Sequence, residues 1–240
     1  MVSFVCALIG LCARLVSSLA IDSRTNCYSG AFIISLHGCN GRGAEQGYEK
    51  NYTDPLLVAI PDSFRYVLPY DGSCDDLYTY YDTVNAGVNT LKSAIEDYAE
   101  ACPSSKIIIV GYSEGAHVTL NTLGGNQTDG TSPLGLSYGT QIVSILTFGD
   151  PSRAMAQSYN RGTNKAVSGV FARGASSLPN LGFYAARLLS YCDLGDIFCA
   201  PNTIGVVDDV HGSYFTGAHY VNEAVSIAVE QFYKPLGRHE

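Results

Sequence analysis

The sequence predicts an α/β fold, a three-layer sandwich in which a doubly wound, mostly parallel sheet of five strands lies between two layers of helices. Two patterns indicate this fold. Short apolar runs alternate with amphipathic segments along the chain, as expected where helices connect the strands of a parallel sheet. The run Lys106-Ile107-Ile108-Ile109-Val110 is β-branched and apolar after its first residue, which is typical of a strand buried on both faces.

The chain before this central strand is expected to contain two strands and two helices. Apolar residues predict strands at 30–36 and 65–69. A short helix at 55–60 ends where a proline follows, because proline cannot continue a helix. An apolar stripe at helical spacing predicts a long helix at 78–101, which ends at Cys102-Pro103. The stripe is formed by Val84, Val88, Leu91, Ile95 and Tyr98.

The chain after the central strand is expected to contain two helices and two further strands. Gly124-Gly125 ends a helix at 116–123. Apolar runs predict strands at 141–148 and 185–191, and the last helix is expected at 218–233. The intervening segments are expected to be loops or irregular, and they are 124–139, 152–184 and 192–217.

Length and composition suit one globular domain with a large core. The chain has 240 residues, of which 46% are apolar, and neither a repeat nor a linker divides residues 21–240. Its net charge is −8 and it has no basic block, so no nucleic-acid partner is expected. No stretch of about eighteen apolar residues is free of charge, so no membrane span is expected.

Residues 1–20 have the pattern of a secretory signal peptide, which predicts an extracellular protein. An apolar run extends from Val2 to Ala13, and Ser18-Leu19-Ala20 puts small residues at the cleavage positions. No Lys or Arg precedes the run, and Arg14 interrupts its end. That arginine also makes the alternative, an N-terminal membrane anchor, the less favoured one.

In a secreted protein, cysteines are expected to form disulfides and Asn-x-Thr sequons can be glycosylated. Of the eight cysteines, Cys6 and Cys12 leave with the signal peptide, and the even remainder suggests disulfides whose pairing the residues alone leave open. The remainder is Cys27, Cys39, Cys74, Cys102, Cys192 and Cys199. No Cys-x-x-Cys or His-x-x-x-His spacing points to zinc, so no metal is expected. Asn51 and Asn126 begin Asn-x-Thr sequons and are predicted glycosylation sites.

Ser113 is the candidate nucleophile. It lies in Gly111-Tyr112-Ser113-Glu114-Gly115, between the strand at 106–110 and the helix at 116–123. A nucleophile elbow needs this strand-to-helix turn, in which glycines relieve crowding and the hydroxyl is lifted above the sheet. The alternative is an ordinary serine at a helix N-cap. A second copy of the pattern at 135–139 follows a proline and precedes a strand, so we exclude it.

A serine hydroxyl becomes a good nucleophile only when a base takes its proton. In α/β-hydrolases the acid and the base follow the serine along the chain, and the loops after parallel strands meet at one edge of the sheet. Asp193 and Asp196 follow the fifth expected strand, and His211 and His219 follow them. His117 lies one helical turn beyond the serine and has no route back to its hydroxyl.

Several ordered motifs together resemble the cutinase family, which includes fungal acetylxylan esterases of carbohydrate esterase family 5. The resemblance covers residues 27–236 and implies an α/β-hydrolase-like fold. Its motifs are the Ser113 elbow followed by Ala116, Cys102-Pro103, Phe148-Gly149-Asp150-Pro151, the run Cys192 to Cys199, and His211-Gly212-Ser213-Tyr214.

The resemblance implies the acid and the base. The family's acid is the Asp of a Gly-Asp pair inside a small disulfide loop, which corresponds to Asp196 and leaves Asp193 as the alternative in the same loop. The family's base lies in a His-x-x-Tyr pattern before the last helix, which corresponds to His211 with Tyr214. His219 lacks the tyrosine and is left as the alternative base.

The resemblance also implies an oxyanion hole made by the backbone N–H groups of Glu114 and Ala44. The family usually has Gln after the serine and a hydroxyl residue in the place of Ala44, so this chain departs at both positions. Glu114 would bring a carboxylate beside the oxyanion, unless Arg42 pairs with it.

The disulfide pairing is likewise implied by the resemblance. It gives Cys192–Cys199 and Cys27–Cys102, and Cys39–Cys74 is the pair that remains. The remaining pair would hold the oxyanion loop.

The resemblance therefore implies a secreted serine esterase that needs no cofactor and acts as a monomer on plant cell-wall esters. Acetylated xylan and cutin are both open as substrates. The apolar stretch 204–207 favours acyl chains, whereas the 17 tyrosines favour sugars. The alternative is a secreted, catalytically silent cell-wall-binding protein on the same fold.

Overall fold

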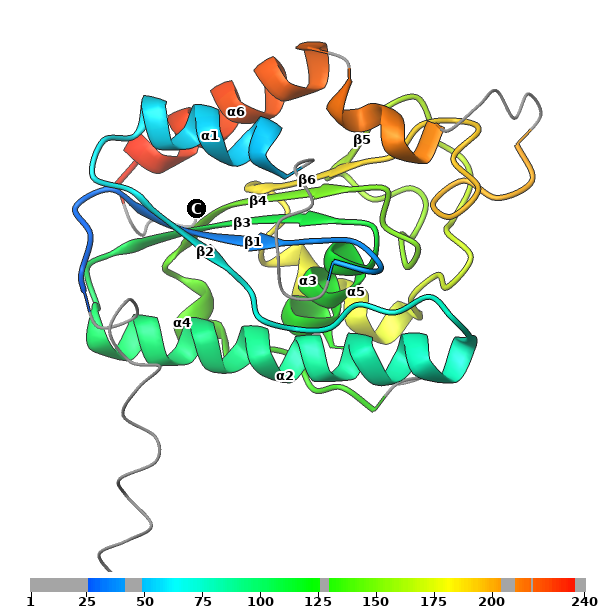
Figure 1. Ribbon diagram of the computed structural model, residues 1–240, viewed down its shortest axis with the longest axis horizontal. Helices are drawn as coiled ribbons and strands as arrows, with labels where there is room; N and C mark the ends of the chain where they lie inside the picture. Colours follow the sequence, from blue (N-terminus) through cyan, green and yellow to red (C-terminus); the bar gives the residue numbers. More distant parts are fainter. Residues whose placement is uncertain (1–25, 42–48, 126–129, 204–209, 217, 236–240) are drawn as a thin grey trace, which may run out of the picture.

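The computed structural model describes residues 26–41, 49–125, 130–203, 210–216 and 218–235 (Figure 1). Its centre is a six-stranded sheet with the order β2-β1-β3-β4-β6-β5, in which every paired strand is parallel. The predicted fold class, a parallel sheet between helices, is confirmed. The strands are β1 (Ala31–Leu36), β2 (Phe64–Val67), β3 (Lys106–Tyr112), β4 (Ile142–Phe148), β5 (Asn160–Arg161) and β6 (Leu188–Tyr191).

Helices cover both faces of this sheet. Figure 1 shows α1 and α6 side by side on one face, and the long α2 with α3, α4 and α5 on the other. The helices are α1 (Lys50–Ala59), α2 (Leu77–Ala101), α3 (Glu114–Gly124), α4 (Leu136–Gly139), α5 (Leu178–Gly182) and α6 (Ala218–Tyr233). Two 3₁₀ helices are η1 (Ala175–Ser177) and η2 (Val210–Phe215).

The central strands bury side chains on both faces, which explains their continuous apolar sequence. In β1, Phe32 and Ile34 enter the core shared with α2, and Ile33 enters the core shared with α1 and α6. In β3, Ile107 and Ile108 divide in the same way. The sheet is therefore fixed from both sides, and its carboxyl edge is a rigid base for loops.

Several short elements differ from the sequence predictions. The segment expected to be irregular at 152–184 contains the two-residue strand β5, η1 and α5, so the sheet has a sixth strand. The expected loops at 124–139 and 192–217 contain α4 and η2. These elements are too short to produce a recognisable period. Helix α1 begins at Lys50 and includes Pro55 in its interior, whereas the predicted helix began at that proline.

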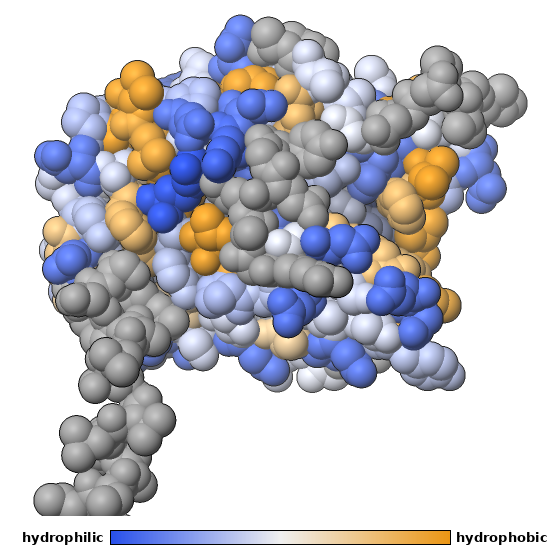
Figure 2. All heavy atoms as spheres, in the orientation of Figure 1, coloured by the Kyte–Doolittle hydropathy of each residue, from blue (hydrophilic) through white to orange (hydrophobic). Residues whose placement is uncertain are grey.

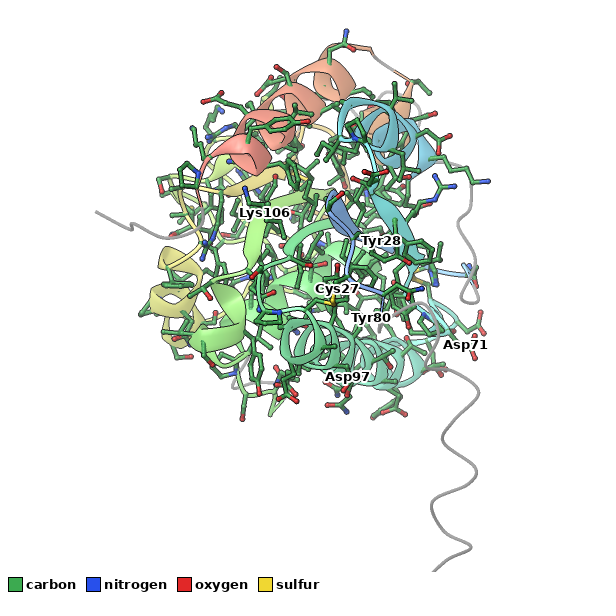
Figure 3. All side chains as sticks on the ribbon, turned by 90° about the vertical axis from the view of Figure 1, so that its left-hand side faces the viewer. Cys27, Tyr28, Asp71, Tyr80, Asp97 and Lys106 are labelled. Carbon is green, nitrogen blue, oxygen red and sulfur yellow. A yellow bond between two sulfur atoms is a disulfide. The ribbon has the colours of Figure 1, made fainter. Side chains whose placement is uncertain are left out.

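Three disulfides tie loops to this frame. Cys27–Cys102 joins the segment before β1 to the end of α2, and Figure 3 shows Cys27 beside that helix. Cys39–Cys74 joins the loop after β1 to the segment before α2, and Cys192–Cys199 closes the loop after β6. Within the described residues, none of the helices has both the length and the apolar character that crossing a membrane requires.

Candidate active site

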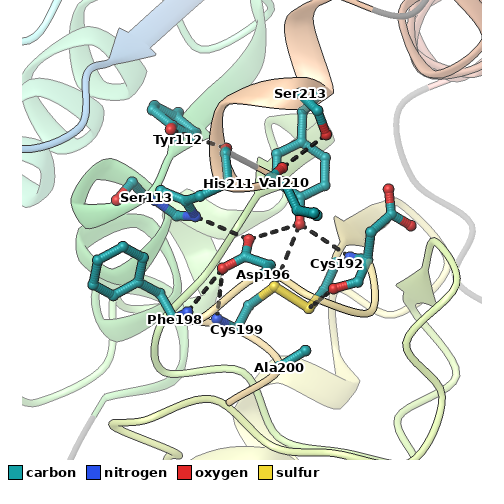
Figure 4. Close-up of polar contacts among 12 residues, drawn as sticks. Tyr112, Ser113, Cys192, Asp196, Phe198, Cys199, Ala200, Val210, His211 and Ser213 are labelled. Atoms are coloured by element: carbon teal, nitrogen blue, oxygen red, sulfur yellow. Dashed lines mark hydrogen bonds and ion pairs between the residues drawn. A yellow bond between two sulfur atoms is a disulfide. The ribbon is translucent and has the colours of Figure 1, made fainter. Parts of the chain in front are cut away.

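Loops that follow three neighbouring strands meet at the carboxyl edge of the sheet. Ser113 follows β3, Gly149 follows β4, and Asp196 follows β6. The helix η2 brings His211 to the same edge, and Figure 4 shows Ser113, His211 and Asp196 in one chain of contacts. The parallel topology therefore gathers residues that lie far apart in the sequence.

Ser113 occupies a strained turn between β3 and α3. Its backbone angles, φ of 54° and ψ of −116°, lie in a region that residues other than glycine rarely adopt. The flanking glycines allow the turn, because a Cβ at Gly115 would lie 2.5 Å from the backbone oxygen of Leu36 and one at Gly111 would lie 2.7 Å from the Gly115 oxygen. Ser113 occupies the N-cap position of α3, but its side chain makes no capping hydrogen bond, unlike that of an ordinary N-cap serine.

The hydroxyl of Ser113 instead faces His211. The two side chains are joined by a 2.9 Å hydrogen bond between Ser113 Oγ and His211 Nε2. The other ring nitrogen, Nδ1, lies 2.9 Å from Asp196 Oδ2. Tyr112 donates a hydrogen bond of 3.0 Å to the His211 backbone oxygen, and a Cβ at Gly149 would lie 2.8 Å from the imidazole. The ring is thus held on several sides in one orientation.

Asp196 is completely buried and accepts hydrogen bonds on both oxygens. Oδ1 accepts from the backbone N–H groups of Phe198 at 2.8 Å and Cys199 at 3.1 Å. Oδ2 accepts from the Tyr214 hydroxyl at 2.7 Å as well as from His211. Burial by itself raises the pKa of Asp196, but the hydrogen bonds and the interaction with His211 outweigh burial and lower it. The carboxylate is therefore ionised when it faces the imidazole.

The alternative acid has different partners. Asp193 Oδ1 accepts hydrogen bonds from the Thr163 backbone and hydroxyl, each at 2.8 Å, and from the Tyr220 hydroxyl at 2.7 Å. These bonds join the loop after β6 to the segment after β5 and to α6. Asp193 therefore has the geometry of a structural residue.

The other histidines are placed away from Ser113 or lie outside the described structure. His117 is buried in α3, where its Nδ1 lies 2.9 Å from the Tyr80 hydroxyl, and burial lowers its pKa to about 4. His37 is buried at the end of β1 and stacks on Tyr70 at 4.3 Å between ring centroids. The side chain of His219 and all of His239 lie outside the described residues.

One half of the expected oxyanion hole is described. Glu114 begins α3, and the first backbone N–H groups of a helix have no partner within it. The loop after β1 passes beside this turn, since a Cβ at Gly38 would lie 3.2 Å from the Ser113 Cβ. Ala44 and Arg42 lie outside the described residues, so the second donor and the Arg42–Glu114 pair stay predictions.

A cavity of about 250 Å³ opens beside Ser113. Its lining is mainly apolar and aromatic, and includes Leu77, Tyr80, Pro151, Phe171, Phe198 and the Cys39–Cys74 disulfide. Large side chains at its rim are exposed, with 60% of Leu77 and 38% of Phe198 accessible to solvent. Figure 2 shows apolar residues on the surface at the right-hand edge of the molecule, the side toward which the strands run. The cavity has room for the acyl part of an ester next to the hydroxyl.

The sequence motif at 148–151 owes its geometry to a buried ion pair. Asp150 lies 3.3 Å from Arg173 and accepts hydrogen bonds from the backbone and hydroxyl of Ser152 at 2.8 and 2.6 Å. These contacts fix the turn that carries Pro151 of the cavity. The motif was visible in the sequence, but its partner Arg173 was not, because it comes from a segment without periodicity.

Only one of the two predicted glycosylation sites lies in the described part of the structure. Asn51 is exposed on α1, and its side-chain amide donates a hydrogen bond of 3.0 Å to the backbone oxygen of Phe215 in η2. Asn126 lies outside the described residues. Glycosylation of both stays a prediction.

Comparisons with known proteins agree with one another. A family model described as Cutinase matches residues 62–232. Acetylxylan esterase 2 of Talaromyces purpureogenus is 27% identical over 226 residues, which cover 88% of this chain and 92% of that protein. Cutinase 11 of Verticillium dahliae is 27% identical over 222 residues, which cover 87% and 72%. A solved structure of an acetylxylan esterase has a TM-score of 0.71 at 26% identity, and the match covers 86% of this chain and 100% of that one.

Proposed function

The chain belongs to the cutinase family and is a carboxylic ester hydrolase, and we propose that it uses Ser113, His211 and Asp196 to hydrolyse esters of plant cell-wall polymers outside the cell. The observation that carries this proposal is the continuous chain of hydrogen bonds, 2.9 Å from Ser113 to His211 and 2.9 Å from His211 to Asp196. Extracellular action is supported by the three disulfides, which form in oxidising compartments.

In the first half of the reaction, Ser113 Oγ attacks the ester carbonyl while His211 Nε2 takes its proton. The imidazolium that forms is stabilised by Asp196, whose Oδ2 faces Nδ1 at 2.9 Å. The negative oxygen of the tetrahedral intermediate accepts a hydrogen bond from the Glu114 backbone N–H. His211 then gives the proton to the leaving alcohol, and an acyl-enzyme remains.

In the second half, water replaces the alcohol. His211 takes a proton from the water, the hydroxide attacks the acyl-enzyme, and the returned proton restores the Ser113 hydroxyl as the acid leaves. Both halves use the same hydrogen-bond chain, so no further proton donor is needed.

The substrates named for the relatives are the candidates for this chain. Acetylated xylan is supported by Acetylxylan esterase 2 and by the solved acetylxylan esterase, and a cutin-like polyester is supported by Cutinase 11. The apolar lining of the cavity beside Ser113 suits an acyl group in either case.

A phosphonate probe that reacts with activated serines tests the catalytic proposal. We expect stoichiometric labelling of Ser113, and none in Ser113→Ala. An absence of labelling in a folded protein would refute the triad and favour a silent wall-binding protein. Rates on acetylated xylan, cutin, and short-chain and long-chain p-nitrophenyl esters then decide which ester is preferred.

A further inference from the structure

The Glu114 side chain is a buried acid that the triad does not use. It is completely buried, and its Oε1 accepts a hydrogen bond of 2.7 Å from the Thr83 hydroxyl of α2. Its Oε2 is buried and has no hydrogen-bond partner among the described residues. A buried carboxylate oxygen without a partner is costly, so this arrangement needs a physical explanation.

The chain between β2 and α2 is shaped around this carboxyl group. A Cβ at Gly72 would lie 2.7 Å from Glu114 Oε2 and 3.0 Å from the Gly38 oxygen, so a larger residue there would displace the carboxyl group. The Gly72 oxygen in turn accepts a hydrogen bond of 2.9 Å from the Asn40 backbone. The same two segments are joined by the Cys39–Cys74 disulfide, which lines the cavity beside Ser113.

Glu114 therefore belongs to two parts of the site at once. Its backbone N–H follows the nucleophile directly, and its side chain contacts the segment at 72–74 that fixes the loop after β1. We propose that Glu114 is a positioning residue for the oxyanion side of the site, and that it works in its protonated, uncharged form. This proposal rests on the proposed serine esterase function.

The surroundings of the carboxyl group favour the uncharged form. Burial raises the pKa of Glu114 to about 7, although the hydrogen bond from Thr83 and the nearby Ser73 backbone N–H act in the opposite direction. The Ser73 N–H itself donates to the Thr83 hydroxyl oxygen at 3.3 Å. No Lys or Arg among the described residues contributes to this shift or forms an ion pair with Glu114. The titratable groups of the loop after β1, of the segment 68–76, of the first two turns of α2 and of the first turn of α3 are His37, Tyr70, Asp71, Asp75, Asp76, Tyr78, Tyr80, Tyr81, Asp82 and His117.

None of these neighbours forms an ion pair with Glu114 in the described part of the chain. The ring nitrogens of His37 lie 2.6 Å from the Gly38 oxygen and 3.0 Å from the Tyr70 oxygen, and His117 is kept neutral by burial and bonds to Tyr80. Burial, and then Glu114, raise the pKa of Tyr70 well above its usual range, so this tyrosine is uncharged. Among the described residues an ionised Glu114 would thus have no cation beside it, and its charge would lie one residue from the oxyanion, where excluded water makes repulsion strong. The pair with Arg42 expected from the sequence is the competing arrangement.

Ionisation of Glu114 should lower kcat more than it changes KM. The oxyanion exists in the transition state and not in the bound ester, so a charge beside it acts on the chemical step. Hence activity should fall as the pH rises through about 7.

The test compares wild type with Glu114→Gln on p-nitrophenyl acetate from about pH 5.5 to about pH 8.5. The ratio of the variant kcat to the wild-type kcat cancels every pH dependence that the two enzymes share, including that of the p-nitrophenol signal. We expect this ratio to rise about fivefold to tenfold with a midpoint near 7, while the KM ratio stays within about twofold. A ratio that does not vary with pH would overturn the proposal.

Glu230→Gln is the matched control, because Glu230 is exposed on α6 and pairs with Lys234 at 2.7 Å. Its ratio to wild type should be flat across the same range. A rise as large as that of Glu114→Gln would show that the effect comes from overall charge, and would also overturn the proposal.

The variant Thr83→Val tests whether Glu114 acts through its titration or has a purely structural role. The Thr83 hydroxyl lowers the pKa of Glu114, so its removal should move the fall in kcat to a higher pH. In the double variant with Glu114→Gln, the fall should be absent. A midpoint that stays in place in Thr83→Val would contradict the assignment.

A direct titration distinguishes failure of this proposal from failure of the proposed function. The ¹³C-carboxyl spectrum of the Glu-labelled wild type, compared with Glu114→Gln, identifies the Glu114 signal. A midpoint near 7 supports the proposal, and a midpoint near 4.5 overturns it, whether or not the protein hydrolyses any ester. If no ester is hydrolysed while this signal titrates near 7, the proposed function fails and the ionisation of Glu114 stands.

Discussion

Asp193 and Asp196 belong to one short loop, but their hydrogen bonds give them different tasks. Asp196 accepts hydrogen bonds from two backbone N–H groups, one tyrosine and His211. Asp193 accepts hydrogen bonds from Thr163 and Tyr220. The partners of Asp196 preserve its charge beside an imidazole, and those of Asp193 join three segments of backbone. At the scale of the residue, the identity of the partner decides the chemistry.

Substitution of single residues should separate the two carboxylates. We expect Ser113→Ala and His211→Ala each to lower kcat/KM by about 10⁴-fold or more, and Asp196→Asn by about 10³-fold to 10⁴-fold, as in other triads. Asp193→Asn, the matched control, and His219→Ala should keep most of the activity. Full activity in the His211 variant, or equal losses in the two Asp variants, would contradict the assignment.

Tyr214 should support Asp196 through its hydroxyl group. Its 2.7 Å hydrogen bond lowers the pKa of Asp196, so Tyr214→Phe should raise that pKa and move the loss of activity at low pH upward. We expect kcat/KM to fall about tenfold, which corresponds to about 1.4 kcal/mol of activation free energy. Tyr220→Phe is the control, because its 2.7 Å bond goes to Asp193, and its acid limb should not move.

The sequence predicted residues whose role depends on local context better than those that depend on distant contacts. The turn at Ser113 was predicted from its strand, glycines and helix, and the choice of Asp196 over Asp193 needed a family resemblance. The contact between Glu114 and Thr83 spans 31 positions of sequence, and that between Tyr214 and Asp196 spans 18. No local pattern encodes such contacts, so the burial of Glu114 could not be predicted.

At the scale of the element, the loop after β6 works as a clamp around the acid. The Cys192–Cys199 disulfide closes it, and the Cys199 backbone N–H donates to Asp196. The Cys199 sulfur also lies 3.4 Å from the Tyr214 hydroxyl. The crosslink therefore sets the position of both the acid and the tyrosine that supports it.

This clamp predicts different consequences for two disulfides. Cys192–Cys199 joins positions 7 apart and Cys27–Cys102 joins positions 75 apart. From chain entropy, removal by paired Ser substitutions should cost about 2.5 kcal/mol for the short loop and about 4.5 kcal/mol for the long one. Activity should follow the opposite order, since only the short loop carries Asp196.

Urea unfolding and kcat/KM of the two double variants check this ranking. The short-loop variant should remain folded with strongly reduced activity. A larger loss of stability in the short-loop variant than in the long-loop one would refute the ranking.

Long elements with a regular hydrophobic pattern were predicted from the sequence, and very short elements were not. Helix α2 was placed to within one residue of its start because its apolar stripe runs through its full length. Strand β5 has two residues and exists because its backbone pairs with β6. The segment around it is held by contacts such as the Arg173–Asp150 pair, which tertiary structure creates.

At the scale of the whole molecule, α3 buries two titratable groups with opposite effects on stability. Burial raises the pKa of Glu114 from 4.5 to about 7 and lowers that of His117 from 6.5 to about 4. Between these values the unfolded chain releases the Glu114 proton that the native state keeps, so stability falls as pH rises. For His117 the unfolded chain binds the proton that the native state refuses, so stability falls as pH decreases.

The two slopes should nearly cancel in the wild type between about pH 4 and about pH 7. Each shift corresponds to about 3 kcal/mol over its full range. Glu114→Gln removes one slope, so the free energy of unfolding of this variant should rise by about 2.5 kcal/mol from pH 4 to pH 6.5 relative to wild type. His117→Gln should show the opposite trend, with stability that decreases toward pH 7.

Urea unfolding of wild type, both single variants and the double variant, at fixed ionic strength and at steps across this range, measures the slopes directly. The double variant should again have a stability that varies little with pH, from a different baseline because the His117–Tyr80 contact is changed. Parallel stability curves for Glu114→Gln and wild type would mean that Glu114 has the same pKa in the folded and the unfolded chain, so that it is ionised in the folded protein over most of the range. In that case the carboxyl group would have to find solvation that its buried, unpaired Oε2 does not have.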